Sequence, residues 1–204
     1  MSPPPEDSLL AAGAASRPSS PDRNEFSAAE RELLLRLAHQ AIVSALQPSA
    51  LSLSPPSPHL AEPRGVFTTL YSRGNLRGCI GHVFPVASLY RAVVETARAA
   101  AFEDMRFRPL AFEELAELEV SLSVLSPLHP IAPQAIEVGR HGLLITLAGR
   151  RGLLLPQVPL ERSWDRITFL EQVCLKAGLP KDAWQTGASV EAFTAEVFGD
   201  RDRR

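Results

Sequence analysis

The stretch LRGCIG, residues 76–81, places an arginine and a cysteine between glycines in a segment that otherwise alternates like a β-strand. In an extended chain the side chains of Arg77 and Cys79 point to the same face, about 7 Å apart. A guanidinium at that distance favours the thiolate, the nucleophilic form of cysteine. Gly78 and Gly81 leave room for another backbone or a ligand. The pattern predicts either a reactive thiol or a small buried cysteine beside a bulge or strand crossing.

Other residues could act with this thiol. In VGRHGLL, His141 follows Gly139 and Arg140, where an imidazole can serve as acid, base or anion-binding donor, although turn histidines are commonly solvated and idle. In LLLPQV, Pro156 indicates an edge or a bulge, and Gln157 could orient a bound group. The candidate catalytic residues are therefore Cys79, Arg77 and His141, and the candidate cleft residues are Gly78, Gly81, Arg140, Pro156 and Gln157.

The remaining chemistry-bearing residues support structural roles. Cys174 lies on the apolar face of a predicted helix, where we expect it to fill the core. The two cysteines are 95 positions apart and lack CxxC or Cys/His spacing, so we expect no disulfide framework and no metal site. FEDMRF brings Asp104 and Arg106 to the end of a helix, where a capping salt bridge is the simplest interpretation. Walker, dinucleotide-binding and GxSxG motifs are missing from the sequence, so we expect no cofactor.

Composition narrows the class of protein further. The chain has 204 residues, enough for one good-sized core, and a net charge of -2. Only 6% of residues are aromatic, so a basic, aromatic patch for RNA has no support. No apolar run approaches the roughly 20 residues of a membrane helix, and the N-terminus is acidic where a signal peptide is basic. We therefore expect a cytoplasmic protein that binds neither nucleic acid nor membrane.

The first half contains a helix, a hairpin and a second helix. Residues 1–24 mix proline, serine and alanine without periodicity, which predicts a disordered tail before a domain at 25–200. Ser27 and Glu30 have capping-box spacing at the start of a helix that ends before the proline-rich connector 48–65. The period then changes to two, and Gly74 with Asn75 supplies the turn of a hairpin. The expected later elements are a helix capped by Ser88, a short acidic helix at 112–118 and a strand at 119–128.

The second half repeats this order. HGLLITLAGRRGLLLPQVP predicts a hairpin with Gly149 at its turn, and the following helix is predicted to start at Ser163 and to stop at Gly178. AFTAEVFGD predicts one last strand. Gly65, Thr69 and Leu70 match Gly142, Thr146 and Leu147 at a constant offset of 77. The sequence thus predicts an α+β protein built from two hairpin-plus-helix repeats, at about 65–130 and 140–199.

These motifs together resemble those of a known family. The ordered set GVFTTL, LRGCIG, AAFED with RF and PL after it, ELEVSLSVLSP, VGRHGLL, GLLLPQV, WD and FLEQVCLKAGLP is similar to the AMMECR domain family, also called AmmeMemoRadiSam system protein A. The resemblance covers about residues 26–199. Met105 departs from the pattern, because many members have proline at this position.

The resemblance implies a curved, mainly antiparallel sheet flanked by helices, with a cleft between unequal lobes. It places Leu76–Gly81, Gly139–Gly142 and Leu155–Gln157 in the family's signature segments. It implies no established reaction, only an association with a radical S-adenosylmethionine enzyme and a Memo-like protein.

Two functions from different classes follow. One is an accessory, partner-binding protein whose Arg77/Cys79 cleft is a docking or small-ligand site. The alternative is a cysteine-dependent enzyme that uses Cys79 with Arg77 and a nearby histidine, His141 or His82. The enzyme needs a base within hydrogen-bonding reach of the thiol, whereas a docking module needs only a shaped surface. We favour the accessory role.

Overall fold

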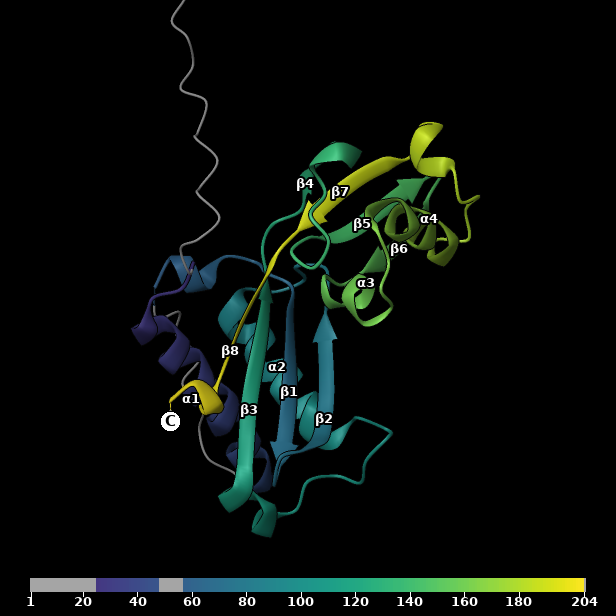
Figure 1. Ribbon diagram of the computed structural model, residues 1–204. Helices are drawn as coiled ribbons and strands as arrows, with labels where there is room; N and C mark the ends of the chain where they lie inside the picture. Colours follow the sequence, from purple (N-terminus) through teal and green to yellow (C-terminus); the bar gives the residue numbers. More distant parts are fainter. Residues whose placement is uncertain (1–24, 48–56, 204) are drawn as a thin grey trace, which may run out of the picture.

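The computed structural model describes residues 25–47 and 57–203, and it forms two lobes with one four-stranded antiparallel sheet each (Figure 1). The α+β class, the antiparallel pairing and the flanking helices are confirmed. The strands form two sheets where one curved sheet was expected. The predicted tail 1–24 and the middle of the connector, 48–56, lie outside the described residues.

The first lobe holds a sheet with the strand order β2-β1-β3-β8. Helix α2 packs against β1 and β2, and α1 packs against α2 (Figure 1). Ser27 and Glu30 form the predicted capping box of α1. The elements are α1 Ala28–Leu46, β1 Val66–Ser72, β2 Asn75–His82, α2 Leu89–Phe102, β3 Leu118–Leu125 and β8 Ala195–Gly199, with short 3₁₀ turns η1 His59–Ala61, η2 Phe112–Glu117 and η5 Asp200–Arg203.

The second lobe holds a sheet with the order β4-β7-β5-β6, and helix α4 packs on β5 and β6. The buried residues of α4 include Cys174, which is fully buried in the core as expected. The elements are β4 His129–Pro130, η3 Pro133–Ala135, β5 Gly142–Leu147, β6 Arg150–Leu154, α3 Gln157–Glu161, α4 Arg166–Lys176, η4 Ala183–Gln185 and β7 Ser189–Phe193.

The two lobes exchange their last strands. Strand β4 follows β3 in the chain but pairs with β7 of the other sheet, and β8 follows β7 but pairs with β3. The two crossing segments meet at Ser126 and Thr194, where Ser126 N–H donates to the Thr194 carbonyl (2.9 Å) and Thr194 N–H donates to Ser126 Oγ (2.9 Å). The last strand predicted from AFTAEVFGD is present as β8, but residues 192–193 of that segment belong to β7, because the chain changes sheets at Thr194.

Three local details also differ from expectation. The first hairpin turn was expected at Gly74 and Asn75, but Arg73 and Gly74 form it, with positive φ angles of 51° and 81°. Asn75 is already the first residue of β2, where it pairs with Ser72 of β1. The N-cap of α4 is Asp165, whose Oδ1 accepts from the Thr168 N–H, and not Ser163. Ser88 precedes α2 but makes no side-chain cap bond.

The two hairpins are equivalent in topology. Leu70 and Ile145 each occupy the third paired position from a two-residue turn, facing Gly78 and Gly152. The offset there is 145 − 70 = 75 residues, not 77. A Cβ on Gly78 would lie 2.1 Å from the Ala100 carbonyl oxygen, and one on Gly152 would lie 2.5 Å from the Ala177 nitrogen. In each lobe a glycine therefore lets the helix pack closely on the hairpin.

Each lobe has its own hydrophobic core, and three further buried hydrophobic residues of the described ranges belong to neither core. One core lies between α1, α2 and the first sheet, and the other between α4 and the second sheet. Leu125, Leu144 and Phe193 are at most 3% exposed but belong to neither core. Leu125 and Phe193 end β3 and β7, next to the crossing at Ser126 and Thr194, and Leu144 lies within β5.

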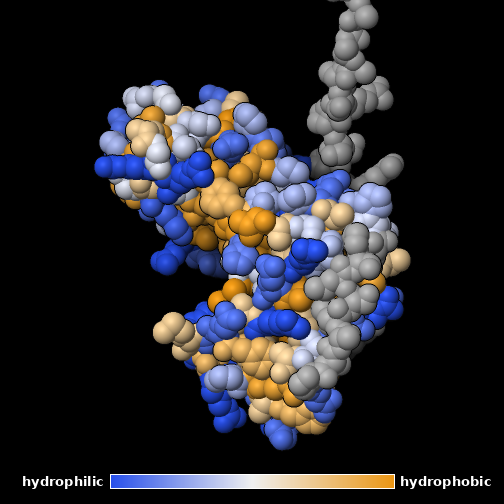
Figure 2. All heavy atoms as spheres, turned by 180° about the vertical axis from the view of Figure 1, so that it is seen from behind, coloured by the Kyte–Doolittle hydropathy of each residue, from blue (hydrophilic) through white to orange (hydrophobic). Residues whose placement is uncertain are grey.

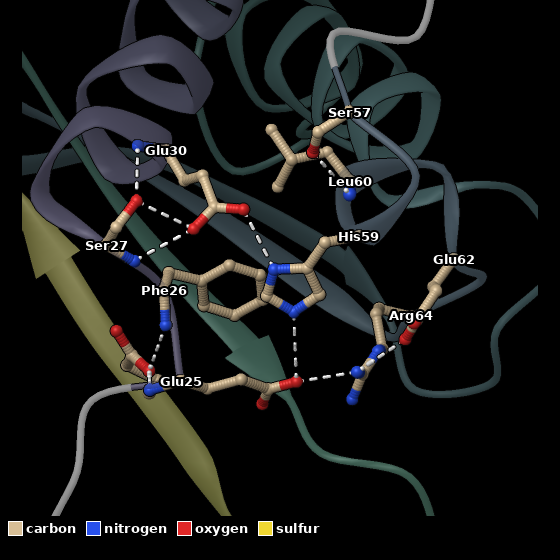
Figure 3. A network of polar contacts seen from close by, with 10 residues as sticks. Glu25, Phe26, Ser27, Glu30, Ser57, His59, Leu60, Glu62 and Arg64 are labelled. Atoms are coloured by element: carbon tan, nitrogen blue, oxygen red, sulfur yellow. Dashed lines mark hydrogen bonds and ion pairs between the residues drawn. The ribbon is translucent and has the colours of Figure 1, made fainter.

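A polar network fastens the start of α1 to the rest of the first lobe (Figure 3). His59 Nδ1 lies 2.8 Å from a Glu30 oxygen, and its Nε2 lies 3.5 Å from Glu25. The His59 ring stacks on Phe26, with the centroids 4.8 Å apart. The almost fully buried Arg64 pairs with both Glu25 and Glu62. Burial lowers the pKa of His59, but its hydrogen bonds and charge interactions with both glutamates outweigh burial, so this pKa is raised above 6.5.

This network predicts a pH-dependent contribution to stability. Because the pKa of His59 is higher in the folded state, its stabilisation is complete below the unfolded value and is lost as the pH rises through the folded value. We expect His59→Gln to cost about 0.5–1 kcal/mol near pH 6, and the cost to shrink by about pH 9. Urea unfolding of both proteins across this range measures the difference. A cost that grows with pH would contradict the assignment.

Candidate functional site

The backbone of Cys79 is held by a loop along the outer edge of β2. Cys79 N–H donates to Asp104 Oδ2 (2.8 Å), and Arg106 Nη2 donates to the Cys79 carbonyl oxygen (3.2 Å). Arg106 also donates to both carboxylate oxygens of Asp104, at 2.9 and 2.7 Å. The predicted Asp104–Arg106 salt bridge thus exists, and it also satisfies the free backbone groups of an edge strand.

Charge–charge contacts shift the pKa values in this loop. The hydrogen bond from Arg106 holds the pKa of Asp104 well below its usual range, with desolvation opposing and the Cys79 N–H adding to the decrease. The hydrogen bond with Asp104 raises the pKa of Arg106, and a smaller part of the increase comes from the Cys79 side chain. The guanidinium that interacts with Cys79 therefore belongs to Arg106.

Arg77 has a different partner from the one expected. Its Nε and Nη2 donate to the two carboxylate oxygens of Glu114, at 2.8 and 3.0 Å, and its side chain is only 11% exposed. The hydrogen bonds from Arg77 contribute most to lowering the pKa of Glu114 to about 2, and the hydrogen bond from the Ala111 N–H adds to the decrease. The guanidinium of Arg77 thus fastens η2 to β2 through a paired, largely buried contact.

The Cys79 thiol lies half-buried on the face of the first sheet that the helices leave open. Its Sγ is 3.3 Å from the Thr69 hydroxyl, on the neighbouring strand β1. Thr69 in turn faces Ser121 of β3. The thiol therefore sits at the end of a row of hydroxyl groups, which donate and accept hydrogen bonds but are not bases at neutral pH.

His141 closes a turn in the second lobe. Its ring Nδ1 accepts from the backbone N–H of Glu137 (3.0 Å), and the backbone N–H of His141 donates to the Glu137 carbonyl oxygen (3.0 Å). Burial lowers the pKa of His141; Glu137 opposes this, while Arg140 and His129 add to it. Arg140 pairs with the Glu137 carboxylate at 3.0 Å. The hydrogen bonds of His141 and Arg140 thus run to Glu137 and not to Cys79.

The glycines of LRGCIG let neighbouring groups come close to β2. Gly78 faces the backbone of α2, on the side of the sheet opposite the Cys79 thiol. A Cβ on Gly81 would lie 2.3 Å from the ring of Phe67 on β1. Pro156, expected at an edge or a bulge, is the N-cap of helix α3, and Gln157 is the first residue of that helix.

A cavity of about 420 Å³ lies between the lobes. Phe67 and Val83 line it from the first lobe, and the second lobe supplies 151–155 of β6 and its end, Val158 of α3 and Lys176 of α4. Seen from behind, the surface is hollowed between the lobes and hydrophobic side chains gather there (Figure 2). Leu153, Leu154, Leu155 and Val158 of LLLPQV line this cavity, whereas Pro156, Gln157 and Cys79 are not among its lining residues.

Sequence reasoning missed most of these lining residues. Phe67 has the ordinary alternation of a strand, and RRGLL of β6 was assigned only to a hairpin. The available signal was the pair Arg150–Arg151 on a short strand, since charged residues commonly mark sheet edges. No helix within the described ranges is long and apolar enough to cross a bilayer. Within the same ranges there is no group of three or more His, Cys, Asp or Glu that could hold a metal.

Comparison with known proteins agrees with the fold and the motifs. The sequence model of the AMMECR1 family matches residues 35–198. The chain belongs to the AMMECR1 family. It is 43% identical over 185 residues to protein MK0488 of Methanopyrus kandleri, covering 85% of this chain and 89% of the relative. A protein of Aquifex aeolicus is 45% identical over 147 residues, covering 68% and 75%.

A solved structure of the AMMECR1 family has the same fold. The crystal structure of the uncharacterized protein PH0010 from Pyrococcus horikoshii superposes with a TM-score of 0.65 at 42% identity, covering 82% of this chain and 90% of that chain. The AMMECR1-type lobes described above are therefore a property that this chain shares with its relatives.

The two cysteines of this AMMECR1-family protein should differ in reactivity. Cys79 is half-buried beside Arg106, whereas Cys174 is fully buried and burial raises its pKa. Because alkylation needs an accessible thiolate, we expect iodoacetamide to modify Cys79 at least about tenfold faster. Mass spectrometry of the timed reaction on folded protein locates the adduct. Modification of Cys174 first would contradict the described geometry.

The Arg77–Glu114 pair predicts a contribution to the free energy of unfolding that is lost at low pH. Since the pKa of Glu114 is lowered from 4.5 to about 2, its stabilisation is present above about pH 4.5 and is lost as the pH falls toward 2. We expect Glu114→Gln to cost about 1–3 kcal/mol at pH 7, and less in acid. Urea unfolding at both pH values, with exposed Glu113→Gln as the matched control, measures this. An equal cost at both pH values would refute the pairing.

Proposed function

We propose that this AMMECR1-family protein is a cytoplasmic accessory protein that docks a partner protein in its interlobe cleft. The observation that carries the proposal is the 420 Å³ cavity between the lobes, whose lining is mostly apolar. Phe67, Val83 and Val158 meet there from separate parts of the fold. A concave, largely apolar surface with a few polar groups is the usual form of a binding site.

The surroundings of Cys79 support binding over catalysis. The thiol lies within hydrogen-bonding distance of the Thr69 hydroxyl, which is not a general base. Arg77 is held by Glu114, and His141 is held by its own turn. These hydrogen bonds thus give Arg77 and His141 structural partners, and within the described ranges neither residue hydrogen-bonds to the thiol.

The family resemblance suggests which partners to test. It associates such proteins with a radical S-adenosylmethionine enzyme and a Memo-like protein, so either protein of the source organism is a candidate occupant of the cleft. The alternative enzyme would use Cys79 as a nucleophile, with Arg106 in the place first assigned to Arg77. The observation behind this alternative is the closeness of the Arg106 guanidinium, which donates to the Cys79 carbonyl oxygen at 3.2 Å.

A binding measurement with matched variants tests the proposal. Leu153→Gln keeps the size of a cleft-lining side chain but removes its apolar character, and Val197→Gln makes a similar change at an exposed position of β8 outside the cleft. We expect Leu153→Gln to weaken binding of the Memo-like protein or the radical enzyme by about fivefold or more. Val197→Gln and Cys79→Ser should change it by less than about twofold.

Two results would overturn the docking role. One is equal weakening by Leu153→Gln and Val197→Gln in calorimetry, because the cleft would then have no special part in binding. The other is a thiol-dependent reaction that Cys79→Ser abolishes while circular dichroism and partner binding stay unchanged. That second result would establish the cysteine-dependent enzyme instead.

A further inference from the structure

Strand β6 leaves backbone hydrogen-bonding groups unpaired at the edge of its sheet. It is the last strand in the order β4-β7-β5-β6, and it pairs only with β5. The hairpin turns through Ala148 and Gly149, so Leu147 and Arg150 form the hydrogen-bonded pair that closes it. Pairs then alternate along an antiparallel ladder, which directs the N–H and C=O groups of Arg151 and Leu153 outward.

The other edge strands in the described part of the molecule are short or make contacts with neighbouring segments. The outward groups of Cys79 on β2 are taken by Asp104 and Arg106. Strand β4 has two residues, one of them Pro130, which has no N–H. The carboxylate of Glu196 on β8 accepts from the backbone of the segment that leads into α1. Among residues 25–47 and 57–203, no hydrogen bond reaches the outward backbone groups of β6 at Arg151 and Leu153.

The interlobe cavity lies along this edge. Its lining includes Arg151, Gly152, Leu153 and Leu154, which are consecutive residues of β6. Phe67 and Val83 face them from the other lobe. An extended chain placed here would therefore find backbone donors and acceptors on one side and apolar side chains on the other, as in strand addition to a sheet edge.

The positive charges that line the cavity determine which side chains a bound extended segment should carry. Among the described residues that line it, Arg151 and Lys176 are the ionisable ones, and both are exposed. The guanidinium of Arg151 lies 5.7 Å from the ring centroid of Phe84, which holds it beside the opening of the cleft. Two cations facing one groove favour carboxylates over lysine or arginine side chains.

We propose that β6 receives an extended, acidic segment of a partner protein as an additional strand in the interlobe cleft. This inference rests on the proposed function, since it names the form of partner that the cleft takes. Backbone hydrogen bonds to Arg151 and Leu153 would supply most of the directionality. Alternate side chains of the segment would face the apolar wall and the two cations.

The test measures the affinity of the hexapeptide acetyl-Val-Glu-Val-Glu-Val-Glu-amide for the complete protein chain. One analogue carries N-methyl groups on its valines and another carries them on its glutamates. In an added strand only every second N–H faces the protein, so one analogue should bind at least about tenfold more weakly than the other. Isotope-edited NMR of the protein should locate the shifts at Arg151 and Leu153.

Charge variants provide the matched controls. Arg151→Glu and Lys176→Glu should each weaken binding of the parent hexapeptide by about tenfold and improve binding of the version with lysine in place of glutamate. Arg162→Glu reverses an exposed cation at the C-terminal end of α3, outside the cavity lining, and should leave both peptides unaffected.

The outcomes separate this inference from the docking role. Equal binding of the two N-methyl analogues, or failure of the parent hexapeptide to bind at millimolar concentration, overturns strand addition at β6. If Leu153→Gln still weakens the Memo-like protein or the radical enzyme in that case, docking in the cleft stands without an added strand. If the N-methyl analogues differ but neither partner protein binds, the strand site stands and those two partners are rejected.

Discussion

The reciprocal exchange of β4 and β8 is the constraint on which the rest of this structure depends. Each crossing segment leaves one sheet and completes the other, and the two segments bond to each other at Ser126 and Thr194. Leu125, Leu144 and Phe193 are buried around this crossing without belonging to either core. Because neither lobe has its full sheet without the other's strand, the angle between the lobes and the shape of the cleft are set by folding itself.

In this arrangement the outer edges of the two hairpins have different surroundings. They share a topology, a two-residue turn and a glycine under a helix. In the first hairpin the outer edge at Cys79 is closed by Asp104 and Arg106, so LRGCIG becomes an anchored structural strand. In the second hairpin the outer edge faces the cleft and carries the cation Arg151. Of two hairpins with the same topology, one thus has its outer edge anchored by a loop, and the other is the edge at which we propose recognition.

Local patterns were sufficient to predict most elements but not their partners. The capping box of Ser27, the hairpin periods and the core position of Cys174 depend on neighbours close in sequence, and they are confirmed. The pairing of Arg77 with Glu114 joins residues 37 positions apart, and nothing in LRGCIG indicates it. Likewise, the break at Thr194 and the edge position of β6 follow from the exchange of strands, which no local pattern encodes. The roles first assigned to Arg77, Cys79 and His141 stay predictions.

Native-state hydrogen exchange across a denaturant series tests the account most directly. If the exchanged strands make the lobes one cooperative unit, the amides of Leu122 in β3 and Leu143 in β5 should exchange with the same free energy of unfolding. In the same experiment the amides of Arg151 and Leu153, which point away from β5, should exchange rapidly. The amides of Gly152 and Leu154, which point toward β5, should be protected. Separate unfolding free energies for the two lobes, or equal protection along all of β6, would contradict the account.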